Sequence, residues 1–453
     1  MNHAVIDLQF GDAGKGSITD SLVCRLNSPA VVRFNGGYNA AHHVVLSDGR
    51  FHCFSTFGSG TLAGARTHLA SPALFNPLAA QAEVEALVAF GISSPLTLLS
   101  VSPDCLLVTP LHSHLSRMRE VARRYKRKGS CGKGIGEAIL DSQQLGSDVL
   151  HAADLFDRPA LERKLRYLWH LKIDQAKQLI DQVPDNQFLN DTYVWLTHRT
   201  YVQELLEAYD TITPQLSFVE DSDFFASVDS DEVIWEGAQG TLLDAKYGFW
   251  PYVTKSRTTT QNIYDLLSEH CSLKAIGVLR AYTTRHGRGP FPTESSFLTK
   301  VLPDIHNPFN TWQEGFRVGW LDLVLLKYAL SANQQIDYLA ITNLDRLRGL
   351  QSVNVCCEYR LSKEIDMSVA RKYGTVERRG GENVLTEISL PKTQEEQETL
   401  TGILSGVSPV YREFSHWSEG KYLDFISESL GKPIACVSRG PTADDKVWDE
   451  STL

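Results

Sequence analysis

The sequence predicts an α/β fold, because apolar segments typical of strands are repeatedly followed by loops rich in glycine. The first apolar segment, 5–10, stops at the glycine-rich segment 11–17, and a helical pattern follows over 18–26. A second apolar segment, 30–34, leads into a loop of small residues at 35–43. In open α/β sheets such loops gather at the carboxyl ends of parallel strands, where ligands bind. We therefore expect both loops to lie at one edge of a parallel sheet.

Segment 11–17 is typical of a loop that wraps an anion. Glycines allow backbone N–H groups to approach phosphate oxygens, and the N-terminus of the following helix adds partial positive charge. Lys15 supplies a point charge, whereas the carboxylate of Asp12 would repel a phosphate unless it held Mg²⁺ or accepted a proton. The spacing is too short for a Walker A sequence. A tight strand-to-helix turn without a ligand is the alternative.

Two histidines, His42 and His43, end the second loop. If that loop lies beside segment 11–17, one of them would act as a general acid toward a bound phosphate. The alternative is a pair of histidines on the surface of a strand.

A second candidate anion site lies between 116 and 136. Residues 116–128 carry seven basic side chains on a predicted helix and lead into the glycine-rich segment 129–136, which contains Lys133. The alternative is a solvated basic helix face. Residues 151–212 are predicted to be mostly helical and contain no motif, so we expect a helical insertion or subdomain, with oligomerisation as one use.

Gln239 and Thr254 belong to the segment richest in candidate binding residues. Gln239 follows a predicted strand at 233–235, and its amide both donates and accepts hydrogen bonds, which suits the edge of a purine. Thr254 and its neighbours offer hydroxyl groups to a phosphate. These two residue types after a strand favour a nucleotide site.

A further strand at 275–281 leads into the irregular segment 282–294. Proline and glycine impose a rigid loop there, and Arg285 and Arg288 add positive charge. Arginines, a histidine and hydroxyl residues are an unusual combination in a purely structural loop, so we interpret this segment as functional.

Two short segments near the C-terminus are candidates for recognising a base. Segment 342–345 carries an Asn-x-Asp sequence after a strand, and a carboxylate there would accept from N1–H and the 2-amino group of guanine; a helix N-cap is the alternative. The turn 438–442 would close over the base. Residues 360–405 are charged, and we expect them to form solvent-facing loops.

Bulk properties exclude several classes of function. With 453 residues and no internal repeat or low-complexity linker, we expect a single domain over 1–453, with a mostly helical subdomain at about 115–215. The net charge of −10 argues against general nucleic-acid binding, and no segment is apolar enough to span a membrane.

The eight cysteines are scattered and include no CxxC pair, which argues against a zinc site or a disulfide framework and fits a reduced cytoplasm. The N-terminus runs directly into a predicted strand, so we expect no secretory signal.

Taken together, the motifs resemble those of the adenylosuccinate synthetase family, and the resemblance extends through nearly the whole chain. The matching blocks are GDAGKG (11–16), NAAHHV (39–44), GKGIGEA (132–138), EGAQGTLLD (236–244), PYVTKSRTT (251–259), AYTTRHGRGPFPTE (281–294), GWLD (319–322), TNLD (342–345) and SRGP (438–441). The resemblance implies a large mixed, mostly parallel central sheet flanked by helices, similar to P-loop NTPases, in a cytoplasmic homodimer.

The resemblance also implies an enzyme of purine biosynthesis that joins L-aspartate to a 6-oxopurine nucleotide, with GTP as co-substrate and Mg²⁺ as cofactor. The γ-phosphate of GTP would move to the O6 atom of IMP, and aspartate would then displace it to give adenylosuccinate.

Roles for individual residues follow from the same resemblance. Asp12 would remove the N1 proton and, with Ala41, hold Mg²⁺; His42 would protonate the β–γ bridge; Gln239 would orient the purine. The residues implied to bind GTP are Gly11, Ala13, Gly14, Lys15, Gly16, Asn343, Asp345, Ser438, Gly440 and Pro441. Those implied to bind the nucleotide and the amino donor are Asn39, Cys131, Leu243, Thr254, Arg285 and Arg317.

The chain departs from the family pattern most clearly at 311–317. An arginine cluster that holds the aspartate carboxylates is missing there, so Arg317, Arg285 or Arg288 would have to compensate. Other departures are Cys131 for a threonine, Asn343 for a lysine, Ala41 for a glycine, and the lack, near Leu145, of an arginine that reaches the nucleotide phosphate from the partner subunit.

Segments 7–11 and 311–317 are more similar to the phage branch of the family, which makes 2-amino-adenylosuccinate from dGMP. That branch has serine where this chain has Asp12. Three hypotheses are therefore open: ligation of aspartate to IMP with GTP; the same chemistry on dGMP or GMP, with ATP or dATP as donor or another amino donor; and a purine-nucleotide-binding protein without catalysis.

Overall fold

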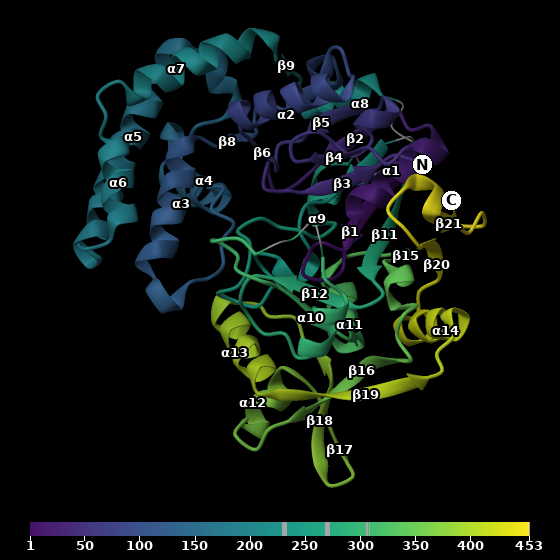
Figure 1. Cartoon of the computed structure of the whole chain (residues 1–453). Helices are drawn as coiled ribbons and strands as arrows, with labels where there is room; N and C mark the ends of the chain where they lie inside the picture. The colour runs from purple at the N-terminus through teal and green to yellow at the C-terminus, as the bar shows by residue number, and fades with distance from the viewer. Residues whose placement is uncertain (229–232, 268–271, 305–306, 308, 453) are drawn as a thin grey trace.

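The computed structural model describes residues 1–228, 233–267, 272–304, 307 and 309–452, and it confirms the predicted α/β fold. A ten-stranded central sheet forms the body of the molecule, and helices cover both of its faces (Figure 1). In spatial order its strands are β21 (Lys446–Trp448), β20 (Ile434–Ser438), β15 (Tyr338–Thr342), β11 (Leu273–Arg280), β1 (Asn2–Asp7), β10 (Val233–Glu236), β2 (Ala30–Arg33), β5 (Arg66–Leu69), β7 (Leu99–Val101) and β9 (Ser217–Phe218).

All neighbouring strands of this sheet are parallel except β20 and β21, which pair antiparallel at one edge. Strand β1 lies in the middle, where Val5 pairs with Glu236 of β10 and Ile276 of β11. Parallel strands need covering on both faces, which explains why their segments are almost continuously apolar. Because β1 and β2 are parallel and separated by β10 alone, the loops after them lie at the same edge, as predicted.

The two faces of the sheet use alternate residues of each strand. Val5 faces α1 (Lys15–Leu26), whose Ile18 and Leu22 are fully buried, whereas Ala4 and Ile6 belong to the core that contains α11. The other helices of the sheet region are α2 (Pro77–Phe90), α8 (Asp221–Ser227), α9 (Gln261–Leu266), α10 (Ser296–Val301), α11 (Leu323–Ala332) and α14 (Glu419–Leu430).

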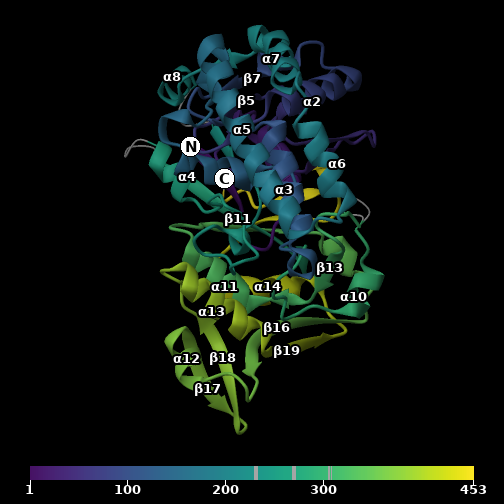
Figure 2. The ribbon, with the colours of Figure 1, turned by 90° about the vertical axis from the view of Figure 1, so that its left-hand side faces the viewer.

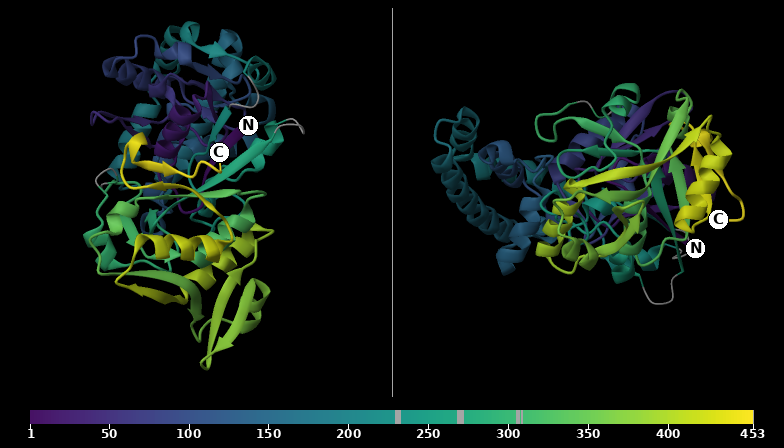
Figure 3. Two further views of the ribbon diagram at one scale, coloured as in Figure 1. Left: turned by 90° about the vertical axis from the view of Figure 1, so that its right-hand side faces the viewer. Right: turned by 90° about the horizontal axis from the view of Figure 1, so that it is seen from below.

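Residues 110–212 form the helical arm, a group of helices that projects to one side of the main body in the right-hand view of Figure 3 and faces the viewer in Figure 2. A buried network joins three of its helices, because Asp141 accepts hydrogen bonds from Lys172 Nζ at 2.7 Å and lies 3.0 Å from His112 Nε2. The division into domain and subdomain stays a prediction. The helices are α3 (Pro110–Ala122), α4 (Ile135–Gln144), α5 (Arg158–Gln182), α6 (Gln187–Leu196) and α7 (Tyr201–Ile212).

The prediction that 360–405 forms loops was wrong, because most of this region forms helices and strands, and its strands belong to a five-stranded sheet at the end of the molecule opposite α7 (Figure 1). Gly380 and Gly381 both have positive φ, 57° and 86°, and form a hairpin turn between the strands 374–379 and 382–388. The arginines beside these glycines favoured the prediction of a solvent-facing loop over that of a hairpin. The elements are β14 (Leu321–Asp322), β16 (Ser352–Leu361), α12 (Met367–Lys372), β17 (Gly374–Arg379), β18 (Glu382–Ile388), α13 (Gln394–Ser405) and β19 (Val407–Ser415).

Three two-stranded ribbons complete the fold. They pair β3 (His42–Val45) with β4 (Phe51–Phe54), β6 (Leu74–Phe75) with β8 (Leu106–Leu107), and β12 (Thr283–His286) with β13 (Phe316–Gly319). Seven cysteines lie in the described part of the chain and all are free thiols, whereas Cys271 lies outside it. None of the described helices combines the length and the apolar character needed to cross a bilayer.

Asp322 gives the fold a pH-dependent stability. Its carboxylate caps α11 and accepts a hydrogen bond from Tyr359 Oη at 2.6 Å, and burial raises its pKa to about 7. The folded protein therefore holds a proton that the unfolded chain releases above about pH 4, so this contribution to stability is lost as pH rises from about 4 to 7. We expect Asp322→Asn to raise the unfolding temperature relative to wild type more at pH 8 than at pH 5. An equal difference at both pH values, by calorimetry, would contradict this.

Candidate active site

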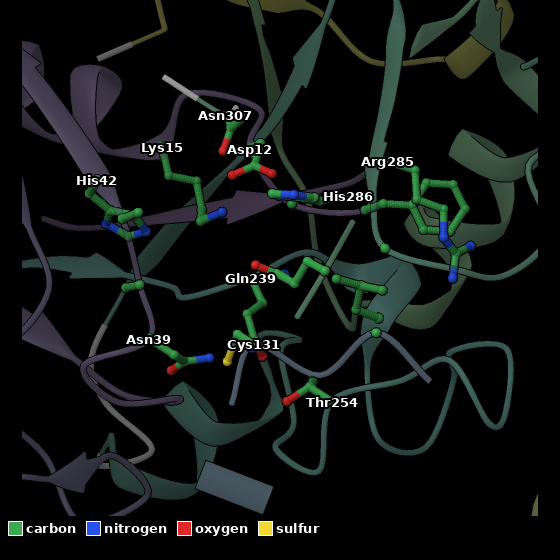
Figure 4. A pocket seen from close by; sticks show the side chains of 18 of the residues that line it. Asp12, Lys15, Asn39, His42, Cys131, Gln239, Thr254, Arg285, His286 and Asn307 are labelled. Carbon is green, nitrogen blue, oxygen red and sulfur yellow. The ribbon is translucent and has the colours of Figure 1, made fainter. Parts of the chain in front are cut away.

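A cavity of about 750 Å³ opens at the carboxyl ends of the central parallel strands. Figure 4 shows Gln239 near its middle, with Asp12, Lys15 and His42 to one side and Cys131 and Thr254 to the other. The predicted site residues that line it are Gly11, Asp12, Gly14, Lys15, Gly16, Asn39, Ala41, His42, Cys131, Gln239, Leu243, Thr254, Arg285, Asn343, Asp345, Ser438, Gly440 and Pro441.

Two predicted site residues, Ala13 and Arg317, are not among the residues that line the cavity. Ala13 is buried inside the glycine-rich loop, where its carbonyl accepts from the Thr342 hydroxyl at 2.6 Å. Arg317 lies on β13, forms an ion pair with Glu294 at 2.8 Å, and donates to the carbonyl of Gly287. The binding roles inferred for both residues stay predictions.

The buried carboxylate of Asp7 organises the glycine-rich loop. Asp7 Oδ2 accepts from the backbone N–H of Ala13 and from Lys15 Nζ, both at 3.0 Å. Gly11 and Gly14 have φ values of 88° and 91°, a conformation that glycine adopts without strain. Helix α1 begins at Lys15, so its N-terminus faces the cavity and favours an anion there.

Asp12 stands at the turn of this loop with a positive φ of 58°. Its backbone carbonyl accepts from Arg280 Nε at 2.5 Å, which fixes the peptide while the carboxylate faces the cavity. Burial raises the pKa of Asp12, and the charges of Arg280 and Lys15 oppose that rise. A carboxylate with a raised pKa is a stronger base than an ordinary one, which suits proton abstraction.

His42 is held by a carboxylate that sequence analysis did not assign a role. His42 Nδ1 lies 2.8 Å from Oε1 of Glu236, which is fully buried and also accepts from the backbone N–H and hydroxyl of Ser59. Burial disfavours ionised Glu236, but the adjacent His42 and its hydrogen bonds hold the pKa of Glu236 at about 2. Glu236 therefore fixes His42 Nδ1 as a donor and leaves Nε2 for a ligand.

Gln239 occupies another strained position, with a φ of 64°. Its Oε1 atom accepts from the Ser256 hydroxyl at 3.4 Å, and that hydroxyl lies 3.2 Å from Thr254 Oγ1. These three hydrogen-bonded side chains connect the middle of the cavity to its Thr254 side.

Gly240 lets two strand-end loops cross in close contact. A Cβ atom at this position would lie 2.2 Å from the carbonyl oxygen of Gln9 and 2.3 Å from the backbone nitrogen of Gly11. We expect Gly240→Ala to destabilise the fold by about 1–3 kcal/mol and to displace the glycine-rich loop, measured by denaturant unfolding and by nucleotide binding. Gly402→Ala, at a helix position with open space around it, is the control. Equal stability of the two variants would contradict this account.

The C-terminal candidates form the far end of the cavity wall. Asn343 starts a short 3₁₀ turn with a positive φ of 56°, but its side chain makes no N-capping hydrogen bond, so the N-cap alternative does not describe it. Lys446 on β21 donates to the carbonyls of Gly440 and Thr442 at 3.0 and 2.6 Å and so closes the turn 438–442. Burial lowers the pKa of Lys446 to about 8.

The arginines that would replace the missing cluster are all engaged within the protein. Arg285 is buried and donates to the carbonyls of Arg288 and Pro290, and burial lowers its pKa to about 9. Arg288 forms an ion pair with Glu314 at 2.7 Å. Arg317 pairs with Glu294, as described above, so each guanidinium would have to exchange a partner to bind a dicarboxylate.

Asp7, Ser59, Glu236, Arg280 and His286 are the site residues that sequence analysis left without a role. A charged residue at the end of an otherwise apolar strand was the available signal, since Asp7, Glu236 and Arg280 end β1, β10 and β11. In a buried parallel sheet such a charge needs a partner or a function.

The donor set of the cavity fits Mg²⁺. Asp12 offers a carboxylate and Ala41 a backbone carbonyl, and Mg²⁺ typically takes one or two protein oxygens together with substrate phosphates and water. Across the described residues, no cluster of three histidine, cysteine, aspartate or glutamate side chains forms a complete metal cage.

Comparison with known proteins gives consistent relatives. The family model described as adenylosuccinate synthetase matches residues 4–447. The adenylosuccinate synthetase of Thermoplasma acidophilum is 30% identical over 462 residues, covering 96% of this chain and 95% of the relative. That of Proteus mirabilis is also 30% identical, covering 98% of each chain.

Two solved structures share the fold. The fully ligated adenylosuccinate synthetase of Plasmodium falciparum has a TM-score of 0.76 at 24% identity and covers 99% of both chains. The succinoaminodeoxyadenylate synthetase of cyanophage S-2L, bound to dGMP and to dATP as an energy donor, has a TM-score of 0.56 at 15% identity, covering 99% of this chain and 95% of the phage chain. Because the family model spans nearly the whole chain and relatives of 30% identity cover almost its full length, the chain belongs to the adenylosuccinate synthetase family of C–N ligases.

Proposed function

We propose that this enzyme joins L-aspartate to C6 of a 6-oxopurine nucleotide, with IMP as the nucleotide and GTP as the phosphoryl donor. The observation that carries the proposal is the arrangement of Asp12, with its raised pKa, in one cavity with the His42–Glu236 pair and Gln239. A base, an acid and a purine-binding amide around a phosphate-binding loop are the groups that this two-step ligation needs.

In the first step Asp12 takes the proton from N1 of the purine, and O6 attacks the γ-phosphorus of GTP. Lys15 and the loop amides stabilise the transferring phosphoryl group, and His42 Nε2 interacts with the β–γ bridge oxygen as GDP leaves. In the second step the amino group of aspartate attacks C6, and the phosphate leaves. Mg²⁺ held by Asp12 and the Ala41 carbonyl would neutralise charge on the phosphate oxygens.

An absorbance assay tests this proposal directly. Purified enzyme with IMP, aspartate, GTP and Mg²⁺ is expected to form adenylosuccinate. No product at high enzyme concentration, with any nucleotide or amino donor, would favour a binding protein without catalysis.

The loop 309–317 favours a second candidate, in which dGMP or GMP replaces IMP and ATP or dATP replaces GTP. Its Asn310 and Gln313 line the cavity, and Glu314 forms an ion pair with Arg288. This wall of the cavity is therefore more polar and less positively charged than a binding site for a dicarboxylate needs. A panel of IMP, GMP and dGMP against GTP, ATP and dATP, with several amino donors, separates the candidates. Strict preference for IMP, aspartate and GTP would exclude the second.

The proposal extends to a homodimer in the cytoplasm, as the family resemblance implies. Sedimentation velocity of the purified chain with and without nucleotide would test the oligomeric state, and a monomer at assay concentration would contradict it.

A further inference from the structure

Two lysines in the cavity wall share one tryptophan ring. The ammonium groups of Lys128 and Lys255 lie 4.4 and 4.5 Å from the centroid of the Trp250 ring, and all three residues line the cavity. Lys128 belongs to the segment after α3, whereas Lys255 follows Thr254, so the pair forms only in the folded chain. The aromatic ring attracts both cations by cation–π interaction and restricts where their side chains point.

Neither ammonium has an acidic partner. Among the described residues, no carboxylate oxygen lies within 4.0 Å of Lys128 Nζ or Lys255 Nζ. The nearby Arg123 is different, because it forms an ion pair with Glu120. Both half-buried ammonium groups therefore lie within 4.5 Å of one ring centre without an ion-pair partner. Burial and the positive charge of Arg123 lower the pKa of both lysines, and the carboxylates of Glu120, Glu137 and Glu398 oppose this only from a longer range. A bound anion would offset this positive charge.

The pair lies on the Thr254 side of the cavity, away from the glycine-rich loop. Figure 4 shows Cys131 and Thr254 across Gln239 from Lys15. Lys255 is next to Thr254 in the chain, and its stem lies 3.4 Å from where a Cβ of Gly136 would stand, at the start of α4. Hydroxyl groups of Thr254 and Ser130 line the same cavity and supply further donors.

We propose that Lys128 and Lys255, held on Trp250, bind the phosphomonoester of the nucleotide that is ligated. This inference rests on the proposed function, because it takes the glycine-rich loop and Lys15 to hold the triphosphate and Gln239 to hold the purine. The monophosphate of the ligated nucleotide is then expected at the end of the cavity that lies across Gln239 from the glycine-rich loop. The two lysines provide the dianion with a cationic contact from within the same chain.

Calorimetric titration of the full chain without triphosphate tests the proposal, using IMP against inosine and dGMP against deoxyguanosine. Lys128→Met and Lys255→Met are each expected to weaken binding of the preferred monophosphate about 10-fold or more, because each removes a charge-assisted contact. Binding of the matched nucleoside should change less than about 2-fold, since the purine contacts are untouched. Lys255→Arg should keep most of the affinity, and raised salt should narrow the difference between wild type and Lys255→Met.

Lys246→Met is the matched control, because Lys246 also lies over an aromatic ring, that of Tyr247 at 5.1 Å, but does not line the cavity. Unfolding temperatures of all variants show whether the fold is intact. Monophosphate affinity that is unchanged in both lysine variants, that falls equally for the nucleoside, or that is undetectable in the wild type would overturn the inference. The titration needs no turnover, so a failure here leaves the ligase proposal standing, and lysine-dependent binding without turnover would remove only the ligase proposal.

Discussion

Replacing Asp12 with asparagine is expected to lower kcat by about 10³-fold, within the range that general bases contribute. Asparagine is nearly the same size, so the left-handed turn at φ 58° and the hydrogen bond from Arg280 to the backbone carbonyl should persist. What is lost is the ability to take a proton. Steady-state kinetics with the preferred nucleotide, donor and amino compound measure the effect.

Binding measurements separate this loss from misfolding. Asp12→Asn should bind the monophosphate substrate about as well as wild type, within ~3-fold, because that contact lies across the cavity from the loop. Asp48→Asn, at an exposed residue outside the cavity, is the control and should keep full activity. If Asp12→Asn retained wild-type kcat, Asp12 would not be the base, and a different proton acceptor would have to be sought.

Glu236→Gln is the second substitution with a large expected effect, a loss of about 10²-fold in kcat/KM, or about 2.7 kcal/mol of transition-state stabilisation. Burial lowers the pKa of His42, and the negative charge of Glu236 opposes that fall. Glutamine cannot carry this charge, and its amide can present N–H to Nδ1 and so reverse the tautomer. The volume of the side chain is unchanged. We therefore expect kcat/KM to fall by more than any decrease in the stability of the fold would explain.

A matched pair elsewhere in the fold controls for folding. His68 Nε2 lies 2.8 Å from Asp221 Oδ1, and neither residue lines the cavity. Asp221→Asn should lower the unfolding temperature to a similar extent, since it also removes the charge beside a buried histidine, while keeping wild-type kcat/KM. Comparable loss of kcat/KM in both variants would mean that Glu236 acts through stability and not through His42.

These variants also bear on the difference between this chain and its family. Asp12, His42 and Gln239, the residues proposed for catalysis, line the cavity, whereas the arginines at 285, 288 and 317 are engaged with protein atoms. In the proposed mechanism, the reaction type depends on the side of the cavity that holds the glycine-rich loop, and the choice of amino donor depends on the side that holds these arginines. Kinetics of Glu314→Gln, which would release Arg288, would reveal whether that ion pair tunes the amino-donor site.

The sequence by itself determined the local chemistry of the molecule. The glycine-rich loop, the short helix after it and the strand-end position of Gln239 follow from glycine conformations and hydrophobic patterns that act over a few residues. Those signals also predicted an α/β sheet with loops at a common edge. The prediction was wrong over 360–405, because the many charged side chains favoured a loop. The pair Gly380 and Gly381 was the signal in the sequence for a hairpin turn.

Only the tertiary structure decided which distant residues meet. The sheet order places β10 between β1 and β2, which brings Glu236 to His42 and Gly240 against Gly11, and the fold closes Lys128 and Lys255 over Trp250. The same packing assigned Arg285, Arg288 and Arg317 to protein partners instead of leaving them free. Such pairings depend on the order in which strands associate, which is set by burial summed over the whole core and not by any local pattern.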